Sequence, residues 1–231
     1  MLPTNMRGVV TLGNARISGH GIYNGLSIGG HLTDGSPTAG AILGQQSWAN
    51  LGQRGTSQWG CNNFSPCIIE GAGTPHTNGD AWSNIEGLAR SIRHNTAANV
   101  WVYDQGGTYD ADDLTCSHQI TSPACDTCGR TALVVYLGAG TLCINSGNYG
   151  AALLAPFARV LVRSSVGYLD GFLVARSMAA LGTSTGTQFH GYRPSVTLDC
   201  MTDDAASIDL VVRTASTYTS SVASIRNGCK D

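Results

Sequence analysis

Short apolar segments separated by small and polar residues run along most of the chain and predict a mainly β protein. Val, Ile and Leu dominate these segments, while Gly, Asn, Ser and Asp fill the gaps, as expected for strands joined by tight turns. Strands this closely spaced are typical of a β-solenoid or a β-sandwich. The predicted strands are Val9–Leu12, Arg16–Ser18, Leu26–Ile28, Ala41–Leu43, Val100–Tyr103, Ala132–Leu137, Leu142–Ile144, Ala152–Leu154, Arg159–Val162 and Phe172–Val174.

A weak internal repeat favours the solenoid. Asn24–Leu32 aligns with Asp170–Met178, and each copy is preceded by an Ala-Arg-apolar triplet, Ala15–Ile17 and Ala158–Val160 respectively. Each copy begins with a turn pair, continues with alternating apolar residues and ends at a small residue. One turn of a stacked β structure needs these features in this order.

One segment, Asp80–His94, predicts an α-helix. Its apolar residues recur at i, i+3, i+4 and i+7, which gives one apolar stripe. We expect this long helix to lie along the stacked strands and to cover an open face. The stripe consists of Ile85, Leu88, Ala89 and Ile92, and the candidate N-caps are Asn78, Asp80 and Ser83.

The amino-acid composition of the chain changes at Pro194. The residues after it are rich in Ser and Thr, and Ile208–Arg213 is their predicted strand. We predict a solenoid domain over residues 1–193, with its helix at 80–94, and a C-terminal cap or assembly arm over residues 194–231. Residues 47–79 are predicted to form a long irregular loop.

Charged residues make up only 12% of the chain, about half the usual share, and the net charge is −2. With a single lysine, Lys230, and no basic stripe, the chain lacks the charge that nucleic-acid binding requires. No apolar run is long enough for a membrane span. Met1–Val10 lacks the apolar core of a signal peptide, as expected for a processed or a cytosolic chain. A neutral, hydrogen-bonding surface is typical of extracellular β-proteins.

The eight cysteines predict disulfides and an oxidising compartment. Proximity favours Cys61–Cys67 and Cys200–Cys229, which leaves the other four to pair among themselves. Buried free thiols are one alternative. A zinc site at the Cys125–Cys128 pair is another, although a second tight pair is missing. The cysteines are Cys61, Cys67, Cys116, Cys125, Cys128, Cys143, Cys200 and Cys229, and Asn63 lies in a candidate glycosylation sequon.

Several motifs suggest catalysis or binding, each with a plainer interpretation. Ser27 and Ser184 each lie in a G-x-S-x-G pattern, but Gly and Pro follow where a nucleophile elbow needs a helix. Asp110, Asp112 and Asp113 are candidates for a Ca²⁺ site or for acid catalysis on polysaccharide, or form a solvated acidic turn. The weaker binding signals are a tryptophan platform of Trp48, Trp59, Trp82 and Trp101, and the alternating Thr183, Thr185 and Thr187 of an ice-binding array.

Three segments carry a family resemblance: Leu153–Val160, Leu169–Met178 and Gln188–Tyr192. They resemble the choice-of-anchor A, or ice-binding-like, adhesive domain, and Asn24–Leu32 and Asp80–His94 follow the same order as its early segment and internal helix. The resemblance implies a right-handed β-solenoid with one helix, located on extracellular surfaces, with an adhesive or structural role. We therefore predict a mainly β fold, a right-handed β-solenoid (β-helix) flanked by one long α-helix and stabilised by disulfides.

The function expected from these features is not enzymatic. We predict an extracellular or cell-surface adhesive or structural protein, a subunit of a surface layer or filament, with no cofactor and no metal. Its partners are expected to be further copies of itself or a cell-surface or matrix component. The alternatives are an ice- or glycan-binding protein and a polysaccharide-active β-helix enzyme.

Overall fold

A computed structural model describes residues 8–17, 21–23, 25–34, 68–71, 74, 77–95, 97, 99–120, 132–145, 147–163, 165–180, 188–190, 210–211 and 222–223. The predicted strand Ala41–Leu43 and the predicted boundary at Pro194 lie outside the described residues. The division into two domains therefore stays a prediction.

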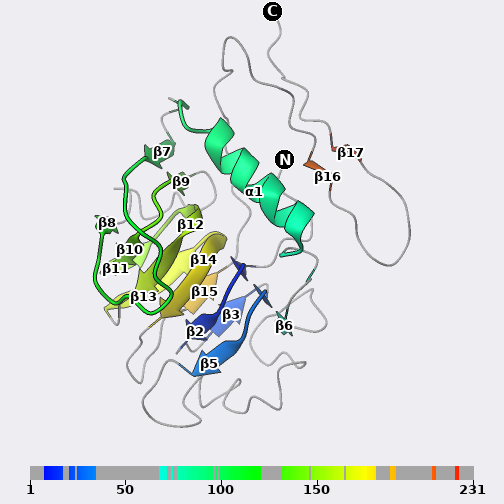
Figure 1. The fold of residues 1–231 in the computed structure, drawn as a ribbon. Helices are drawn as coiled ribbons and strands as arrows, with labels where there is room; N and C mark the ends of the chain where they lie inside the picture. The colour runs from blue at the N-terminus through cyan, green and yellow to red at the C-terminus, as the bar shows by residue number, and fades with distance from the viewer. Residues whose placement is uncertain are drawn as a thin grey trace, which may run out of the picture.

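Most strands belong to one parallel sheet of eleven strands (Figure 1). Its main path has the order β6-β4-β1-β14-β12-β10-β8, and β2, β5, β7 and β9 join it at the sides. The strands are β1 (Val9–Thr11), β2 (Ala15–Ile17), β4 (Leu26–Ile28), β5 (Leu32–Asp34), β6 (Ile68–Glu70), β7 (Val100–Tyr103), β8 (His118–Ile120), β9 (Leu133–Tyr136), β10 (Thr141–Ile144), β12 (Ala152–Val162) and β14 (Leu173–Ala180).

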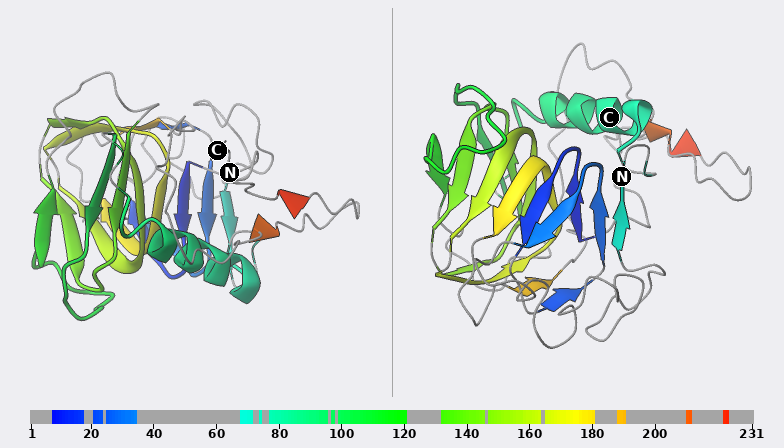
Figure 2. Two further views of the ribbon diagram at one scale, coloured as in Figure 1. Left: turned by 90° about the horizontal axis from the view of Figure 1, so that it is seen from above. Right: turned by 60° about the horizontal axis from the view of Figure 1, so that its bottom comes forward.

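A second parallel sheet of four strands, in the order β11-β13-β15-β3, faces the first (Figure 2). Its strands are β3 (Gly21–Tyr23), β11 (Gly147–Tyr149), β13 (Val166–Asp170) and β15 (Gln188–His190). Two short antiparallel strands, β16 (Leu210–Val211) and β17 (Val222–Ala223), form a third sheet of their own.

The large sheet has two halves because its longest strands, β12 and β14, change register midway. Their pairing shifts between Ala155 and Arg159, around Pro156, which has no N–H to donate to a ladder. The first half contains β7, β9, the starts of β12 and β14, β1, β4 and β6. The second half contains β8, β10, the ends of β12 and β14, β2 and β5.

The main core lies between the two sheets, and strand alternation decides which residues enter it. Leu173 pairs with both Leu153 and Val9, and all three side chains are buried in this core. Their neighbours Leu154 and Val174 point to the opposite face and belong to a separate apolar cluster. Rows of equivalent side chains at one level are what in-register parallel pairing produces.

Helix α1 (Gly79–Ser91) covers the outer face of the first half (Figure 1). The side chain of Asn78 accepts a hydrogen bond from the N–H of Ala81 and caps the helix. Trp82 and Ala89 are buried against the sheet, and the indole N–H of Trp82 donates to Glu86. The predicted apolar stripe is thus confirmed as the surface that packs, and Asn78 is the cap among the three candidates.

The predicted right-handed β-solenoid with one long helix is wrong. A solenoid of the expected kind stacks each turn on the turn before it, whereas here β1 lies between β4 and β14, two strands far apart in the chain. In the described part of the chain, the strands form a large parallel sheet with one helix rather than turns in chain order. The helix has 13 residues, which span about 20 Å, and is not long.

Candidate functional site

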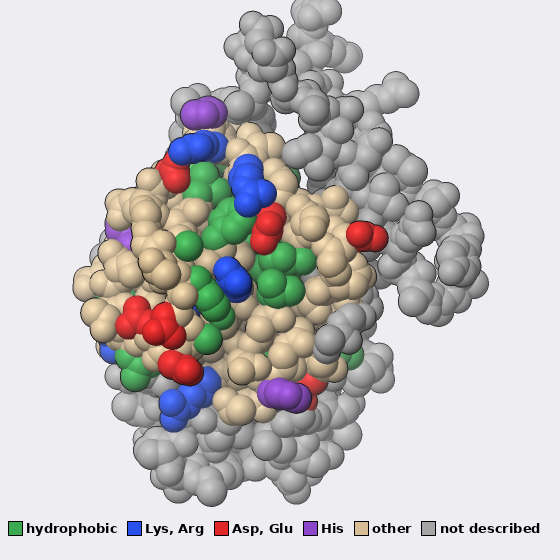
Figure 3. Space-filling model, viewed as in Figure 1, with side chains coloured by type: hydrophobic (Ala, Val, Ile, Leu, Met, Phe, Trp, Pro, Cys, Tyr) green, Lys and Arg blue, Asp and Glu red, His purple; other side chains and the backbone are tan. Residues whose placement is uncertain are grey.

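The polar segment between β7 and β8 crosses the outer face of the second half of the large sheet. We call residues 104–117 the strap. It is mostly exposed, and Figure 3 shows acidic side chains gathered where it crosses the sheet. The strap contains the acidic residues that the sequence singled out, Asp110, Asp112 and Asp113.

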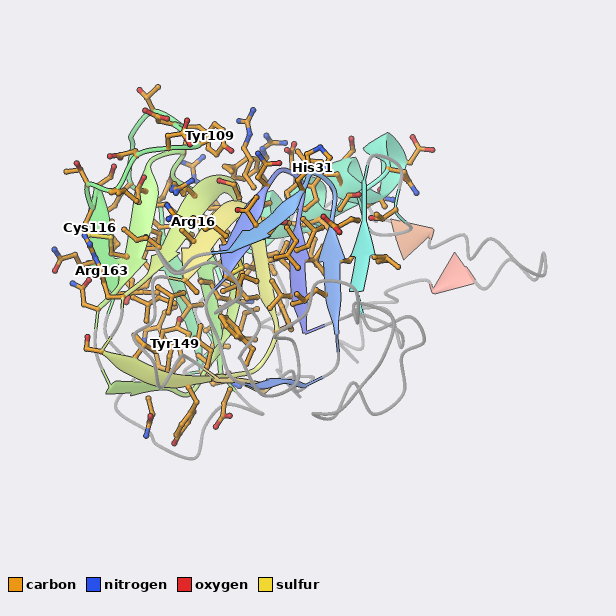
Figure 4. The ribbon with its side chains drawn as sticks, turned by 90° about the horizontal axis from the view of Figure 1, so that it is seen from below. Arg16, His31, Tyr109, Cys116, Tyr149 and Arg163 are labelled. Carbon is orange, nitrogen blue, oxygen red and sulfur yellow. A yellow bond between two sulfur atoms is a disulfide. The ribbon has the colours of Figure 1, made fainter. Side chains whose placement is uncertain are left out.

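A disulfide and hydrogen bonds hold the C-terminal end of the strap. Cys116 is bonded to Cys143 in β10, and the N–H of Ser117 donates to the carbonyl of Thr141. The guanidinium of Arg163 donates to the carbonyl of Leu114 at 3.1 Å and to the sulfur of Cys116 at 3.3 Å. Cys116 and Arg163 lie at the same outer edge of the sheet (Figure 4).

The three aspartates have different roles. One oxygen of Asp113 accepts from the N–H of Thr115 at 2.7 Å, and the other accepts from the hydroxyl of Thr141 at 2.9 Å. These hydrogen bonds lower the pKa of Asp113. Asp110 accepts from the N–H of Asp112 at 2.9 Å, while the Asp112 side chain is exposed. Asp113 therefore ties the strap to the sheet.

Two arginines from neighbouring strands meet the strap. Arg159 in β12 is only 7% exposed. Burial lowers the pKa of Arg159, and the charges of Asp112, Tyr109, Asp110 and Asp113 oppose that change. Arg176 in β14 is exposed and places its guanidinium 4.1 Å from the centre of the Tyr109 ring. A guanidinium keeps its proton at any ordinary pH, so both remain cations.

Two buried polar atoms beneath the strap have no hydrogen-bond partner. They are Nε of Arg159 and Oγ of Ser177, whose residue is 1% exposed. Arg159 and Ser177 are register partners on β12 and β14, so the two atoms come from adjacent positions of the sheet. Most buried polar groups in proteins are satisfied, which makes this pair the most unusual feature of the strap region.

Sequence reasoning found the aspartates but missed Tyr109, Arg159, Arg176 and Ser177. The sequence signal that could have revealed the last three was the presence of polar residues within otherwise apolar strands. Arg159 follows Phe157 and Ala158 in β12, and Arg176 and Ser177 interrupt β14. Only the fold brings these two strands beneath the strap.

Ser27, in the first G-x-S-x-G pattern, has a structural role. It lies within β4, is fully buried, and its hydroxyl lies 3.1 Å from the hydroxyl of Thr74, which in turn lies 2.6 Å from that of Thr77. A nucleophile elbow needs an exposed serine on a strand-to-helix turn, so the structure agrees with the plainer interpretation of the Ser27 pattern. Ser184 lies outside the described residues.

Cys116 and Cys143 form a disulfide, so neither thiol can join a zinc site at the Cys125–Cys128 pair. Among the residues that the structure describes, no group of three or more His, Cys, Asp or Glu side chains is placed to hold a metal ion. The remaining candidates lie outside the described residues: Cys61, Cys67, Cys125, Cys128, Cys200, Cys229, Asn63, Trp48, Trp59, Thr183, Thr185 and Thr187.

The two described tryptophans do not form a platform. Trp82, a residue of α1, is buried against the sheet, whereas Trp101 in β7 packs against the main core and is half-buried. The outer row of the second half is equally unlike an ice-binding array. It runs Gln119, Cys143, Leu161, Ala179, Arg16 and Thr33, with mixed sizes and chemistry.

Aromatic side chains fill the end of the main core next to β7 and β8. The His118 ring lies 5.2 Å from the Tyr103 ring and 5.8 Å from the Tyr136 ring. Tyr136 and Tyr149 are fully buried, and burial raises the pKa of both phenols. Figure 4 shows Tyr149 between the two sheets. Trp101 and Tyr103 are only half-buried, so this end of the core presents aromatic surface.

No helix among the described residues is long and apolar enough to cross a membrane. Comparison with protein-family models, with curated proteins and with solved structures finds no match to this chain. The resemblance to the choice-of-anchor A type of adhesive domain therefore stays a prediction.

Proposed function

We propose that this protein is a non-enzymatic extracellular structural or adhesive protein that associates head to tail with further copies of itself. The observation that carries the proposal is the end of the large sheet at β7. Among the described strands, β7 pairs on one side only, with β9. Unpaired strand edges are templates for another chain.

The backbone of β7 is suited to accept a further strand. The carbonyls of Asn99 and Tyr103 accept from the N–H groups of Leu133, the first residue of β9, and Leu137, the residue after it. Parallel pairing alternates along a strand, so Val102 directs its N–H and C=O away from β9. Next to this edge, the half-buried Trp101 and Tyr103 offer apolar contact area to the same partner.

A second copy fits this edge because the strands at the two edges of the sheet, β7 and β6, run in the same direction. The ladders from β7 to β6 are all parallel, and among the described strands β6 pairs on one side only, with β4. The β6 edge of one copy placed on the β7 edge of the next continues the parallel sheet. Such a contact joins two different surfaces, so each copy keeps one free edge for the next, and repetition without closure into a ring generates filaments.

Two further features support the extracellular and non-enzymatic parts of the proposal. A disulfide such as Cys116–Cys143 persists in oxidising compartments, and the chain is only 12% charged. Two of the candidate catalytic residues have structural roles, since Ser27 is buried among threonine hydroxyls and Asp113 ties the strap to the sheet.

The test is assembly of a proline variant. In Val102→Pro the outward N–H of β7 is lost while the bonds to β9 remain, because proline is tolerated where a strand faces outward. Sedimentation velocity and electron microscopy over a concentration series should show filaments for the unmodified chain and monomers for Val102→Pro. Val102→Ala, which keeps the N–H, is the matched control and should assemble.

Thermal unfolding separates loss of assembly from loss of fold. A monomeric Val102→Pro variant that unfolds close to the temperature of Val102→Ala supports the proposal. An unmodified chain that stays monomeric at every concentration tested contradicts it, as does a Val102→Pro variant that still forms filaments.

A further inference from the structure

We propose that Arg159 and Ser177, beneath the strap, bind a hydroxyl group of a neutral carbohydrate. The site consists of these two residues with Tyr109, Asp110 and Asp112 at its rim. The inference deepens the proposed adhesive function by naming a ligand class, and it rests on that function only for the expectation that the ligand is an extracellular glycan.

The first argument is the pair of unsatisfied atoms. Nε of Arg159 carries an N–H that can only donate, and the Ser177 hydroxyl can donate or accept. Leaving such groups buried without partners costs free energy, and the cost is larger for a charged group. Both atoms come from register partners, so a single small group can contact the two together.

The charge around the site selects the ligand. Arg159 and Arg176 contribute two positive charges, while Asp110, Asp112 and Asp113 contribute three negative ones. A carboxylate or phosphate that approached Arg159 would be repelled by the aspartates, and a cation would be repelled by Arg159 itself. A neutral hydroxyl can accept from Arg159 and donate to a carboxylate, so it satisfies both kinds of neighbour.

The exposed rim favours a sugar over an isolated hydroxyl. Asp112 and Asp110 are exposed, and their negative charges favour the charged form of Arg159. Adjacent hydroxyls of one sugar can therefore reach the buried pair and an acid at the rim. A few well-placed polar groups of this kind give ligand sites their specificity.

Ligand entry requires the strap to lift, because Ser177 is 1% exposed. The strap is tied at its C-terminal end by the disulfide at Cys116 and by Asp113. Its other end contains Gly106 and Gly107, the latter with a φ of +126°, a conformation that favours glycine. Asp104, at that end, is ion-paired with Arg93, so the exposed middle of the strap around Asp110 and Asp112 is the part that has to move away from the sheet.

The test uses the monomeric Val102→Pro variant as background, so that binding is measured apart from assembly. An array of neutral and acidic oligosaccharides is probed first, and the strongest neutral probe is then titrated by calorimetry. Ser177→Ala should weaken binding about threefold to tenfold, since it removes one neutral hydrogen bond. Arg159→Met should weaken it about tenfold to a hundredfold, since it removes a charged donor.

Ser177→Ala is a safe variant because it deletes a hydroxyl that has no partner, so the fold should be retained. Ser83→Ala, on the exposed surface of α1, makes the same chemical change elsewhere and should bind like the parent. The proposal is overturned if no neutral probe binds, which would mean that the pair holds water only. It is also overturned if acidic probes bind best, or if Ser177→Ala binds like Ser83→Ala. None of these outcomes bears on filament formation.

Discussion

The two halves of the large sheet are covered in different ways. Helix α1 covers the first half with apolar side chains, among them Trp82 and Ala89. The strap is held over the second half by a disulfide, by the hydrogen bond that the Asp113 carboxylate accepts from Thr141, and by the contact between Tyr109 and Arg176. The same two strands, β12 and β14, run beneath both covers.

The difference shows how each cover obtains its stability. An amphipathic helix removes apolar area from water along its whole length, so its stabilisation is distributed over many contacts. A polar segment that lacks an apolar stripe buries little apolar area, so it depends on a few specific contacts with the sheet. Such a cover can leave polar groups unsatisfied beneath it, as it does at Arg159 and Ser177.

The largest effect is expected from removal of the helix anchor. Trp82→Ala should lower the free energy of unfolding by about 3–5 kcal/mol, because it leaves a cavity between α1 and the sheet. Urea unfolding measures the loss. Trp101→Ala is the matched control, and it should cost less because Trp101 is only half-buried. If the two variants lost the same free energy of unfolding, apolar burial would stabilise the packing of α1 no more than it stabilises β7.

Removal of the strap disulfide should have the next largest effect. The bond closes a loop with a sequence separation of 27, for which chain entropy predicts a loss of about 3–4 kcal/mol in Cys116→Ala/Cys143→Ala. Hydrogen exchange measured by mass spectrometry should increase in the strap and not in α1. Equal increases in both segments would show that the two covers unfold as one unit.

The helix-covered half is also the half that sequence reasoning predicts best. The predicted bounds of Leu26–Ile28 and Val100–Tyr103 are those of β4 and β7, because apolar runs flanked by small or polar residues are strong local signals. Ala152–Leu154 and Arg159–Val162 prove to be one strand, β12, since Pro156 interrupts the pairing but not the extended backbone.

The arrangement of the strands could not be predicted in the same way. The repeat correctly marks Gly25 and Gly171, which both have positive φ before a strand. Its alignment is displaced by one residue, however, because Leu26 shares its level with Leu173 rather than with Phe172. Local patterns define strands, but the placement of β1 between β4 and β14 depends on contacts between distant parts of the chain.

The candidate site was the least predictable part. Asp110, Asp112 and Asp113 stand out as a cluster in the sequence, whereas Arg159 and Ser177 are separated from them by dozens of residues. Their meeting depends on β12 and β14 lying side by side beneath a strap whose course has no hydrophobic period. Polar contacts of this kind follow from the fold and cannot be inferred from spacing.

A smaller effect tests the polar contacts at the start of the helix. Ser27→Ala should cost about 1 kcal/mol, because the Ser27 hydroxyl bonds to Thr74 while Thr74 retains Thr77 as a partner. Ser83→Ala is the control and should stay within about 0.5 kcal/mol of the parent in urea unfolding. If Ser27→Ala matched this control, the Ser27 hydroxyl would contribute nothing to the stability of the helix-covered half.

The smallest effect is expected from the acid that ties the strap. Hydrogen bonds from Thr115 and Thr141 hold the pKa of Asp113 below its ordinary value of 3.8. A lowered pKa in the folded state means that the carboxylate stabilises the fold above the ordinary value, and that this contribution disappears as the pH falls through the folded pKa. The unmodified chain should therefore lose part of its stability below about pH 4.

Asp113→Asn should remove the part of the stability that depends on the ionised Asp113 carboxylate. The difference in melting temperature between the parent and the variant should be constant from pH 5 to 7 and should shrink at lower pH, as measured by circular dichroism. Asp112→Asn is the matched control, because no described hydrogen bond ends on the Asp112 carboxylate, and it should follow the parent profile more closely. A parent–variant difference for Asp113→Asn that did not change with pH would mean that the ionised Asp113 carboxylate does not stabilise the strap.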